Sequence, residues 1–372
     1  MNVLLIPDKF KGSLSAEEVI NCISNGVKKV FPKTKIASIL ASDGGDGFLE
    51  SVARYREVEE IVVDTVDPLG KKIRAPFHFD LVSKSAFVEM AQASGLVLLK
   101  EAERNPLQTS TFGTGIQIQK AIELGARSIY LGLGGSATND GGCGIAKALG
   151  WEFLDKEGKD LYPTGRNLSK IKSIVPSKLT RGISFYAVND VNNPLLGPLG
   201  ASHVYAKQKG ASTDDILFLE SALIHLAELV KTQLNKDVAK VPGAGAAGGA
   251  AYGLKAFCNA SFLSGIDYIL NLAQVDELVK KHNFQFIITG EGKIDVQSIH
   301  GKLISGVVDL GKRHDIPIIG VCGKLDLSEK EKKKLPMLAL LEAGDPSESL
   351  KYNMENAAEL LEASIYKFFS SL

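Results

Sequence analysis

A glycine-rich stretch, Gly132–Gly144, combines the residue types that hold phosphate groups. It reads GLGGSATNDGGCG and stands between an apolar run that favours a strand and residues 145–149, which favour a helix. Glycines leave backbone N–H groups uncovered, and a cluster of such groups at the start of a helix attracts anions. Hydroxyl, amide and carboxylate groups follow at Ser136, Thr138, Asn139 and Asp140. The stretch therefore predicts a site for a nucleotide phosphate and its metal ion or, as the alternative, a tight strand-to-helix turn with polar capping groups.

Three further loops that are rich in charged residues and glycine follow predicted strands. They comprise residues 7–13, 42–47 and 289–297. Ligands of parallel α/β sheets bind beyond the carboxyl ends of the strands, where the strand order reverses. Two carboxylates ~4 Å apart repel each other by about 4 kcal/mol at an effective dielectric constant of 20, so such a cluster needs cations. Lysines and a magnesium ion can supply them, and this combination favours phosphoryl transfer over hydride or acyl transfer.

Strands and helices alternate at both ends of the chain. The expected strands are residues 3–6, 35–40, 284–289, 317–322 and 337–341, and the expected helices are residues 15–30, 47–55, 298–313 and 350–369. This alternation predicts a doubly wound parallel sheet with the flavodoxin-like strand order 2-1-3-4-5. The middle of the chain, with expected strands at residues 61–66, 72–82 and 86–89, is predicted to form an inserted mixed α/β domain. The predicted domains are therefore residues 1–58 with 259–372, and residues 59–258.

The composition restricts the classes of function. The chain has 372 residues, which favours two domains over one. Its 43 Lys and Arg balance its 43 Asp and Glu, which argues against a general nucleic-acid or membrane-surface protein. The four cysteines are far apart and form no CxxC pair, so we expect a reducing cytoplasm and neither zinc nor a disulfide framework. No apolar run reaches the ~20 residues of a membrane-spanning helix.

Further candidates lie in the middle of the chain. Asp190 ends a predicted strand and could orient a substrate hydroxyl and accept its proton, or it could close an Asx turn. Lys209 could contact a phosphate or lie on the surface. Gly243, Gly245 and Gly248 have the spacing GxGxxG, but no clear strand precedes them, so a dinucleotide site is not expected. The sequence has no GxxxxGK[ST] motif, no protein-kinase signature and no Gly-x-Ser-x-Gly elbow.

Together these motifs resemble the glycerate kinase family of the bacterial and animal type. The matching segments run in family order over nearly the whole chain, at residues 7–15, 42–47, 89–96, 104–115, 132–144, 190–197, 208–211, 242–249 and 289–302. The resemblance implies one flavodoxin-like domain and one of restriction-enzyme-like topology. It also implies ATP- and Mg²⁺-dependent phosphorylation of D-glycerate to 2-phosphoglycerate. The chain departs from the family pattern at Lys9, Ser42, residues 46–48 and Lys207, which concerns fine substrate preference more than the reaction class.

We expect ATP and D-glycerate to bind in a cleft between the two domains, without nucleic-acid or membrane partners; a homodimer is compatible with the sequence. The expected triphosphate-binding residues are Gly134, Gly135, Ser136, Ala137, Thr138 and Asn139, with Gly243, Gly245 and Gly248. The expected catalytic residues are Asp190, Asp43, Asp295, Lys9 and Lys11, and Asp43 and Asp295 are also the expected metal ligands. Ser13, Lys209, Glu291 and Gln297 are expected to bind the substrate.

Three other functions are compatible with parts of the pattern. A kinase for another small hydroxy acid or sugar acid would share the glycine-rich loop, and a screen of acceptors with ATP would identify it. A non-catalytic nucleotide or metabolite sensor would release no ADP when glycerate is added. An NAD-dependent dehydrogenase depends on the GxGxxG spacing alone, and absence of nicotinamide binding would exclude it.

Overall fold

The computed structural model describes residues 1–42, 44–45, 47–299 and 303–372, so the predicted Asp43 lies outside the described residues. The chain divides into two compact units: unit 1 comprises Met1–Ser42 and Ile266–Leu372, and unit 2 comprises Asp43–Gly265. Within the described part of the chain, no helix combines the length and apolarity needed to cross a membrane. Both units combine helices with parallel strands, which confirms the predicted α/β class.

The boundaries of the two units differ from the predicted domain boundaries. Helix α2 (Phe48–Tyr55), expected in the first domain, packs on β4 (Lys72–Asp80) and β5 (Ser85–Glu89) of unit 2. Strand β10 (Ser261–Leu263) pairs with β9 (Ser184–Val188) of the same unit. The ends of unit 2 therefore extend beyond residues 59–258, because these two elements complete its sheet and cover it.

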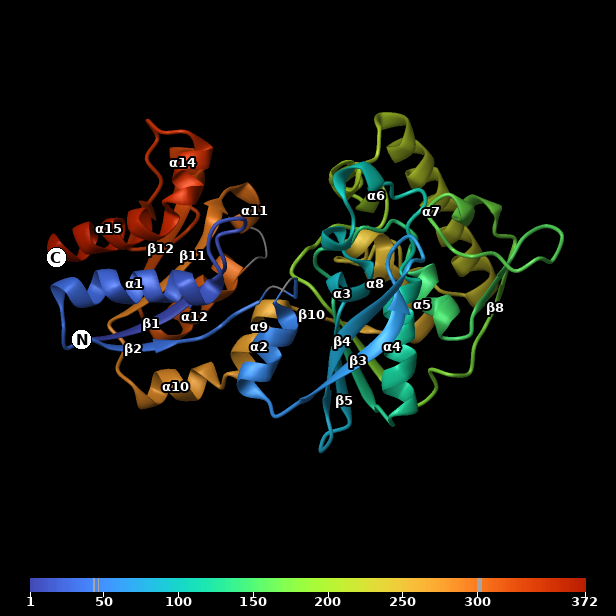
Figure 1. Ribbon diagram of the computed structural model, residues 1–372, viewed down its shortest axis with the longest axis horizontal. Coiled ribbons are helices and arrows are strands. Elements are labelled where there is room, and N and C mark those ends of the chain that lie inside the picture. The colour runs from blue at the N-terminus through green and yellow to red at the C-terminus, as the bar shows by residue number, and fades with distance from the viewer. Residues whose placement is uncertain (43, 46, 300–302) are drawn as a thin grey trace. The chain divides into compact units, whose positions relative to one another are not determined.

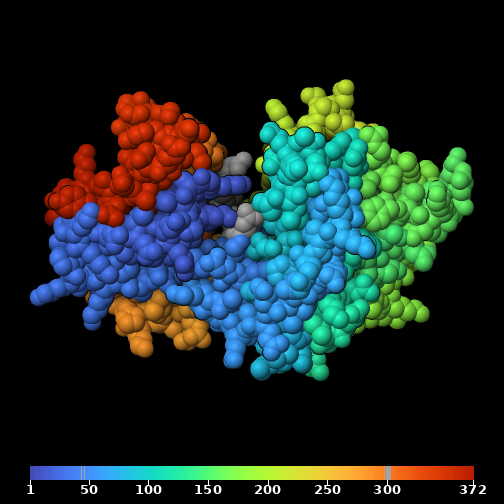
Figure 2. Space-filling view, viewed as in Figure 1, coloured from blue at the N-terminus to red at the C-terminus, as the bar shows by residue number. Residues whose placement is uncertain are grey.

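Unit 1 is built on a five-stranded parallel sheet (Figure 1). Its strands are β1 (Asn2–Pro7), β2 (Lys35–Ser38), β11 (Phe286–Ile294), β12 (Ile318–Leu325) and β13 (Ala339–Glu342). The order β13-β12-β11-β1-β2 is the order 2-1-3-4-5 that the alternation of elements predicts. Helices α1 (Ala16–Val30) and α15 (Ala357–Ser370) pack side by side against one face of the sheet. In Figure 2 the blue N-terminal surface accordingly lies beside the red C-terminal surface. The remaining helices are α9 (Gly265–Leu272), α10 (Val275–Lys281), α11 (Val296–Ile299), α12 (Leu303–His314), α13 (Glu329–Lys332) and α14 (Leu350–Glu355).

Local chemistry explains where the helices of unit 1 begin and end. The Ser15 hydroxyl accepts a hydrogen bond from the Glu18 amide while the Glu18 carboxylate accepts one from the Ser15 amide, which confirms Ser15 as the N-cap of α1. The single helix expected at residues 350–369 is wrong, because α14 and α15 are separated at Asn356. Nδ2 of Asn356 donates to the carbonyl oxygen of Tyr352 at 2.9 Å, and such local side-chain bonds compete with a continuous helix.

Unit 2 contains a six-stranded mixed sheet in the order β10-β9-β6-β5-β4-β3. The neighbours β5, β6 (Ser128–Gly132), β9 and β10 are parallel, whereas β3 (Glu59–Val66), β4 and β5 are antiparallel. A small antiparallel pair, β7 (Glu152–Leu154) and β8 (Ser173–Val175), lies outside this sheet. The apolar core forms against α4 (Phe112–Glu123), α5 (Cys143–Ala148), α7 (Thr213–Leu234) and α8 (Ala246–Cys258); the short helices are α3 (Ala91–Ser94) and α6 (Ala201–Tyr205).

The register of the parallel strands places four loops at one edge of this sheet. Glu89 pairs with Gly132, Gly132 with Val188, and Val188 with Leu263. These residues are the carboxyl ends of β5, β6, β9 and β10, the edge at which open parallel sheets bind ligands. The glycine-rich loop and the loop that contains Asp190 therefore begin side by side.

Candidate functional site

The glycine-rich loop after β6 packs backbone against backbone with residues 44–45. The Gly134 amide donates to the carbonyl oxygen of Gly44 at 3.0 Å. A Cβ atom on Gly134 would lie 2.1 Å from the Cα atom of Gly45, and one on Gly44 would lie 2.6 Å from the carbonyl oxygen of Val188. Gly44 also has a φ of 84°, which favours glycine. The glycines of both motifs therefore allow a close approach that side chains would prevent.

The buried side chain of Lys209 holds the glycine-rich loop in place through hydrogen bonds. Its side chain is only 2% exposed, and its Nζ donates to Ser136 Oγ at 2.8 Å and to the carbonyl oxygen of Thr138 at 2.7 Å. Burial lowers the pKa of Lys209 to about 7, against the attraction of the Asp140 carboxylate, which raises it. The surface position considered for Lys209 is therefore wrong, because the side chain reaches into the core and fixes the turn at Ser136.

Asp140 ties the end of the same loop to the start of α4. Its carboxylate accepts hydrogen bonds from the Thr111 amide and hydroxyl, both at 2.8 Å, and from the Gly142 and Gly144 amides, both at 3.1 Å. Burial raises the pKa of Asp140, while these hydrogen bonds lower it. The expectation that Asp140 adds a carboxylate to a phosphate and metal site is wrong, because the side chain is fully buried among protein donors.

The remaining polar residues of the loop also point into the protein. Thr138 and Asn139 are fully buried, and Nδ2 of Asn139 donates to Ser202 Oγ at 3.2 Å. Ala137 is buried too, and its amide donates to the carbonyl oxygen of Ser94. Gly134 is half-buried and Gly135, with a φ of 72°, is exposed. Gly134 and Gly135 are therefore the part of the loop that is accessible to a ligand, with the braced Ser136 beside them.

The second glycine-rich turn, residues 242–249, packs against the first. Ala247, Gly248 and Gly249 have consecutive left-handed φ values of 55°, 65° and 84°. The carbonyl oxygen of Gly248 accepts a hydrogen bond from the Gly141 amide at 3.1 Å, and a Cβ atom on Gly248 would lie 2.0 Å from the carbonyl oxygen of Thr138. Gly243 and Gly245 are likewise buried, against backbone oxygens of Val191 and Pro194. In this structure the GxGxxG spacing thus serves close packing.

Asp190 stands two residues beyond the carboxyl end of β9 and is half-buried. Its Oδ1 accepts a hydrogen bond from the Gly265 amide at 3.0 Å. The neighbouring Asn189 supplies the local turn, because its Oδ1 accepts from the Val191 amide at 3.2 Å. Asp190 is therefore held by a loop of the adjacent strand β10, as a positioned acid or base would need.

Two residues that sequence reasoning did not select stand beside these loops. Glu89, 3% exposed at the end of β5, accepts a hydrogen bond from the Leu49 amide in the first turn of α2 at 3.2 Å. Arg104 lies against Gly210, where an added Cβ would come within 2.1 Å of the Arg104 carbonyl oxygen. The Arg104 Nε is buried, and no described group accepts a hydrogen bond from it. A signal in the sequence could have identified both residues. Glu89 and Arg104 are the charged first residues of the matching segments 89–96 and 104–115.

In unit 1 the loop after β1 packs against the carboxyl-terminal half of β11. The Asp8 amide donates to the carbonyl oxygen of Gly290 at 2.7 Å, next to the pair Pro7 and Gly290. A Cβ atom on Gly292 would lie 3.2 Å from the Lys11 amide nitrogen. The structure thus gathers four predicted residues at the carboxyl ends of these strands: Lys9, Lys11, Ser13 and Glu291. Lys11 is exposed, Lys9 and Glu291 are half-buried, and Ser13 Oγ donates to the Phe10 carbonyl oxygen at 3.0 Å.

Asp295 stands immediately after β11, which is longer than predicted. Residues 290–294 were expected in a loop but continue the strand and pair with β12. Nζ of Lys293 lies 3.6 Å from Asp295 and 2.6 Å from Asp326, and the hydrogen bond to Asp326 raises the pKa of Lys293. The Asp295 amide donates to Ser298 Oγ at 3.1 Å. Gln297 lies in α11, and its side chain and all of Asp43 fall outside what the structure describes.

The described residues contain no group of three or more His, Cys, Asp or Glu side chains arranged to hold a metal ion. Magnesium in phosphoryl-transfer sites needs only one or two protein carboxylates, because substrate phosphates and water complete its coordination. Asp190 and Asp295, which are half-buried at strand ends, fit that requirement, whereas the fully buried Asp140 does not. All four cysteines are free and buried, as expected for a chain without a disulfide framework.

The sequence is similar to known proteins over its whole length. Residues 3–372 match the glycerate kinase family. The Glycerate 2-kinase of Escherichia coli (strain K12) is 41% identical over 87% of this chain and 86% of its own length. The Glycerate kinase of Bacillus subtilis (strain 168) is 37% identical and covers 100% of this chain and 98% of its own length.

A solved structure is similar in fold as well as in sequence. A crystal structure described as that of a glycerate kinase 2 from Salmonella typhimurium LT2 superposes with a TM-score of 0.80 at 35% identity, covering 100% of this chain and 98% of the other. The family match, the relatives and this structure agree with the arrangement of motifs along both units. The chain belongs to the glycerate kinase family.

Proposed function

We propose that this protein transfers the γ-phosphoryl group of ATP to D-glycerate and releases ADP and 2-phosphoglycerate. The observation that carries the proposal is the match to the glycerate kinase family over residues 3–372. The name of the Escherichia coli relative, Glycerate 2-kinase, supports the hydroxyl at carbon 2 as the acceptor. The bond between the γ-phosphorus and the bridging oxygen breaks, a bond to the glycerate oxygen forms, and the hydroxyl proton leaves to a base.

In unit 2, Gly134, Gly135 and Ser136 would contact the phosphates of ATP. The two glycines are the accessible residues of their loop, and Lys209 holds Ser136 in place. A loop that is fixed before the ligand arrives loses little entropy on binding and presents its dipoles to the developing charge. Arg104 would add a guanidinium, a group that binds phosphate oxygens strongly.

Asp190 would act as the base that orients the glycerate hydroxyl and accepts its proton. The hydrogen bond from the Gly265 amide fixes its side chain while the residue stays half-exposed at the end of β9. A carboxylate held within hydrogen-bonding reach of a substrate hydroxyl can accept its proton in the transition state. Magnesium, when bound, would neutralise phosphate charge; Asp190 offers a carboxylate for it in unit 2, and Asp295 offers one in unit 1.

In unit 1, the loops after β1 and β11 would bind the organic acid. Lys9 and Lys11 would neutralise the glycerate carboxylate, with Ser13 as a hydrogen-bonding partner. Glu291 and Gln297 would contact the glycerate hydroxyls, and Asp43 would share the magnesium ion. The predicted cleft between the two domains, a homodimer and a cytoplasmic location remain predictions.

The test is to incubate the full chain with ATP, magnesium and D-glycerate and to identify the product by ¹³C and ³¹P NMR. We expect ADP and a phosphorus signal coupled to the carbon 2 proton of glycerate. L-Glycerate and glycerol serve as matched acceptors with the wrong configuration and without the carboxylate. A product phosphorylated at carbon 3 would contradict the proposed position, and absence of ADP release with any acceptor would contradict the activity itself.

A further inference from the structure

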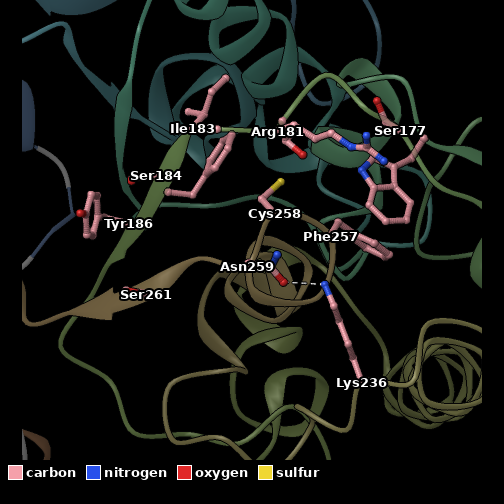
Figure 3. A pocket seen from close by; sticks show the side chains of 14 residues that line it. Ser177, Arg181, Ile183, Ser184, Tyr186, Lys236, Phe257, Cys258, Asn259 and Ser261 are labelled. Carbon is pink, nitrogen blue, oxygen red and sulfur yellow. Dashed lines mark hydrogen bonds between the residues drawn. The ribbon is translucent and has the colours of Figure 1, made fainter.

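A cavity of about 430 Å³ lies at the amino-terminal edge of the unit 2 sheet, opposite the edge that carries the glycine-rich loop (Figure 3). Ser184 and Ser261, which line it, are the first residues of β9 and β10. Asp190 and Gly265, by contrast, follow the last residues of the same strands. The cavity is therefore separate from the candidate site, and its volume is within the range of pockets for small metabolites.

The charge of the cavity lining is positive. Its fourteen lining residues include the cations Arg181 and Lys236 and no Asp or Glu. Nζ of Lys236 donates to Asn259 Oδ1 at 2.7 Å and also to the carbonyl oxygen of Ala256, so the ammonium group is fixed at the cavity wall (Figure 3). Arg181 is exposed and also lines the cavity (Figure 3). A cavity with two cations and no acid favours an anion.

The wall also contains a buried donor that lacks an acceptor. Trp151 is 6% exposed and packs against Phe257, with ring centroids 5.0 Å apart. Its indole Nε1 is buried, and none of the described groups accepts a hydrogen bond from it. A buried indole N–H without an acceptor destabilises a protein, and Trp151 is one of the residues that line the cavity. A ligand in the cavity therefore lies beside the Trp151 ring and changes the environment of its indole.

We propose that this cavity, defined by Trp151, Arg181 and Lys236, is a second binding site that takes a small anion carrying a phosphate or carboxylate group. Arg181 pairs with the anion, and Lys236 and the hydroxyls of the wall complete its hydrogen bonds. Because the site lies at the amino ends of β9 and β10, a ligand there contacts the same two strands that hold Asp190 and Gly265 at their other ends. This proposal does not depend on the kinase reaction proposed for the site at the carboxyl edge of the sheet.

The chain supplies its own probe for this site. Trp151 is the single tryptophan among the 372 residues, so the indole Nε1–H resonance and the tryptophan fluorescence report on the cavity alone. The full chain is titrated with inorganic phosphate in one arm and with succinate in the other, at constant ionic strength. We expect a saturable shift of the indole resonance in at least one arm, and the arm that responds identifies the anionic group.

Two variants that each remove one exposed positive charge distinguish binding in the cavity from binding elsewhere. Arg181→Gln is expected to weaken the response about tenfold, since a hydrogen bond between charged partners is lost. Lys178→Gln, three residues away and outside the cavity lining, is expected to stay within about twofold of the original chain. Absence of a saturable shift in both arms, or an equal response of Arg181→Gln and the original chain, would overturn the proposal. Turnover is not the readout, so either result is independent of the proposed kinase activity.

Discussion

The buried Lys209 predicts a specific dependence of unit 2 stability on pH. Its pKa in the folded chain is about 7, because burial disfavours the charged amine. An unfolded lysine has a pKa of about 10.4, so between these two values the unfolded chain binds more protons than the folded chain. The free energy of unfolding must therefore rise with pH in that window. Integrating the linkage relation from pH 6.5 to 8.5 gives a gain of about 2 kcal/mol from this one residue.

Urea unfolding, followed by the fluorescence of Trp151, measures this gain in the unit that contains Lys209. Lys209→Met should lower stability, because Ser136 Oγ and the Thr138 carbonyl lose their donor, and should remove the gain between the two pH values. Lys207→Met is the matched control, since Lys207 is exposed two residues away and should leave the gain intact. Buried thiols such as Cys258, whose pKa burial raises, act in the opposite direction above about pH 8.5, but equally in all variants.

The reasoning fails if Lys209→Met gains stability over this range as the original chain does. It also fails if Lys207→Met loses the gain, because the dependence would then come from surface charge. An independent measurement is the ¹³Cε chemical shift of Lys209, which should titrate near pH 7 in the folded chain. A normal lysine titration would show that the amine reaches solvent and does not brace the loop.

Four other substitutions test the roles assigned above. Asp190→Asn should reduce turnover by roughly 10²–10⁴-fold without changing the unfolding transition, and near-normal turnover would remove Asp190 as the base. Asp140→Asn should lower the unfolding free energy of unit 2 by roughly 3 kcal/mol, since an amide nitrogen then faces buried donors, whereas Thr111→Val should cost only about 1 kcal/mol. Arg104→Gln should raise the KM for ATP or for glycerate about tenfold with unchanged stability, and an unaltered KM for both would exclude Arg104 from the site.

The strand order of unit 1 was predictable because short apolar runs alternate with amphipathic helices at both ends of the chain. The buried run Val3–Ile6 is too short for a helix of average length and is followed by a capped amphipathic helix, which restricts the chain to a few topologies. The end of β11 was not predictable in this way. Glu291 and Lys293 are charged, yet both pair with β12, because the neighbouring strand supplies their backbone partners whatever their side chains are.

The limits of sequence reasoning in the candidate site are of a different kind. Residue types predicted that the glycine-rich loop follows a strand, as it follows β6, but they could not show which side of the loop faces the interior. Lys207 and Lys209 have the same charge and adjoin the same motif, yet one is exposed and the other is buried. Only the tertiary position of Ser136 and Thr138 decides which lysine finds acceptors. The glycine that follows Lys209 was a local signal in the sequence that this segment is tightly packed. Gly210 has a φ of 96°, and the Arg104 carbonyl oxygen leaves no room for a Cβ atom there.

The buried side chains and the glycines have different roles in the glycine-rich loop. Lys209 and Asp140 hold the loop in place from the interior, whereas Gly134 and Gly135 are accessible from outside. Charged side chains that are fully buried cannot contact a ligand without leaving their partners, and leaving them would cost the hydrogen bonds that fix the loop. The accessible residues, Gly134 and Gly135, carry no side chain and present only backbone dipoles. Recognition of phosphate by such dipoles depends on their orientation, and the buried charges fix that orientation from behind. If the loop binds ATP as proposed, substitution of either buried residue should weaken that binding through disorder of the loop, although neither side chain is accessible to a ligand.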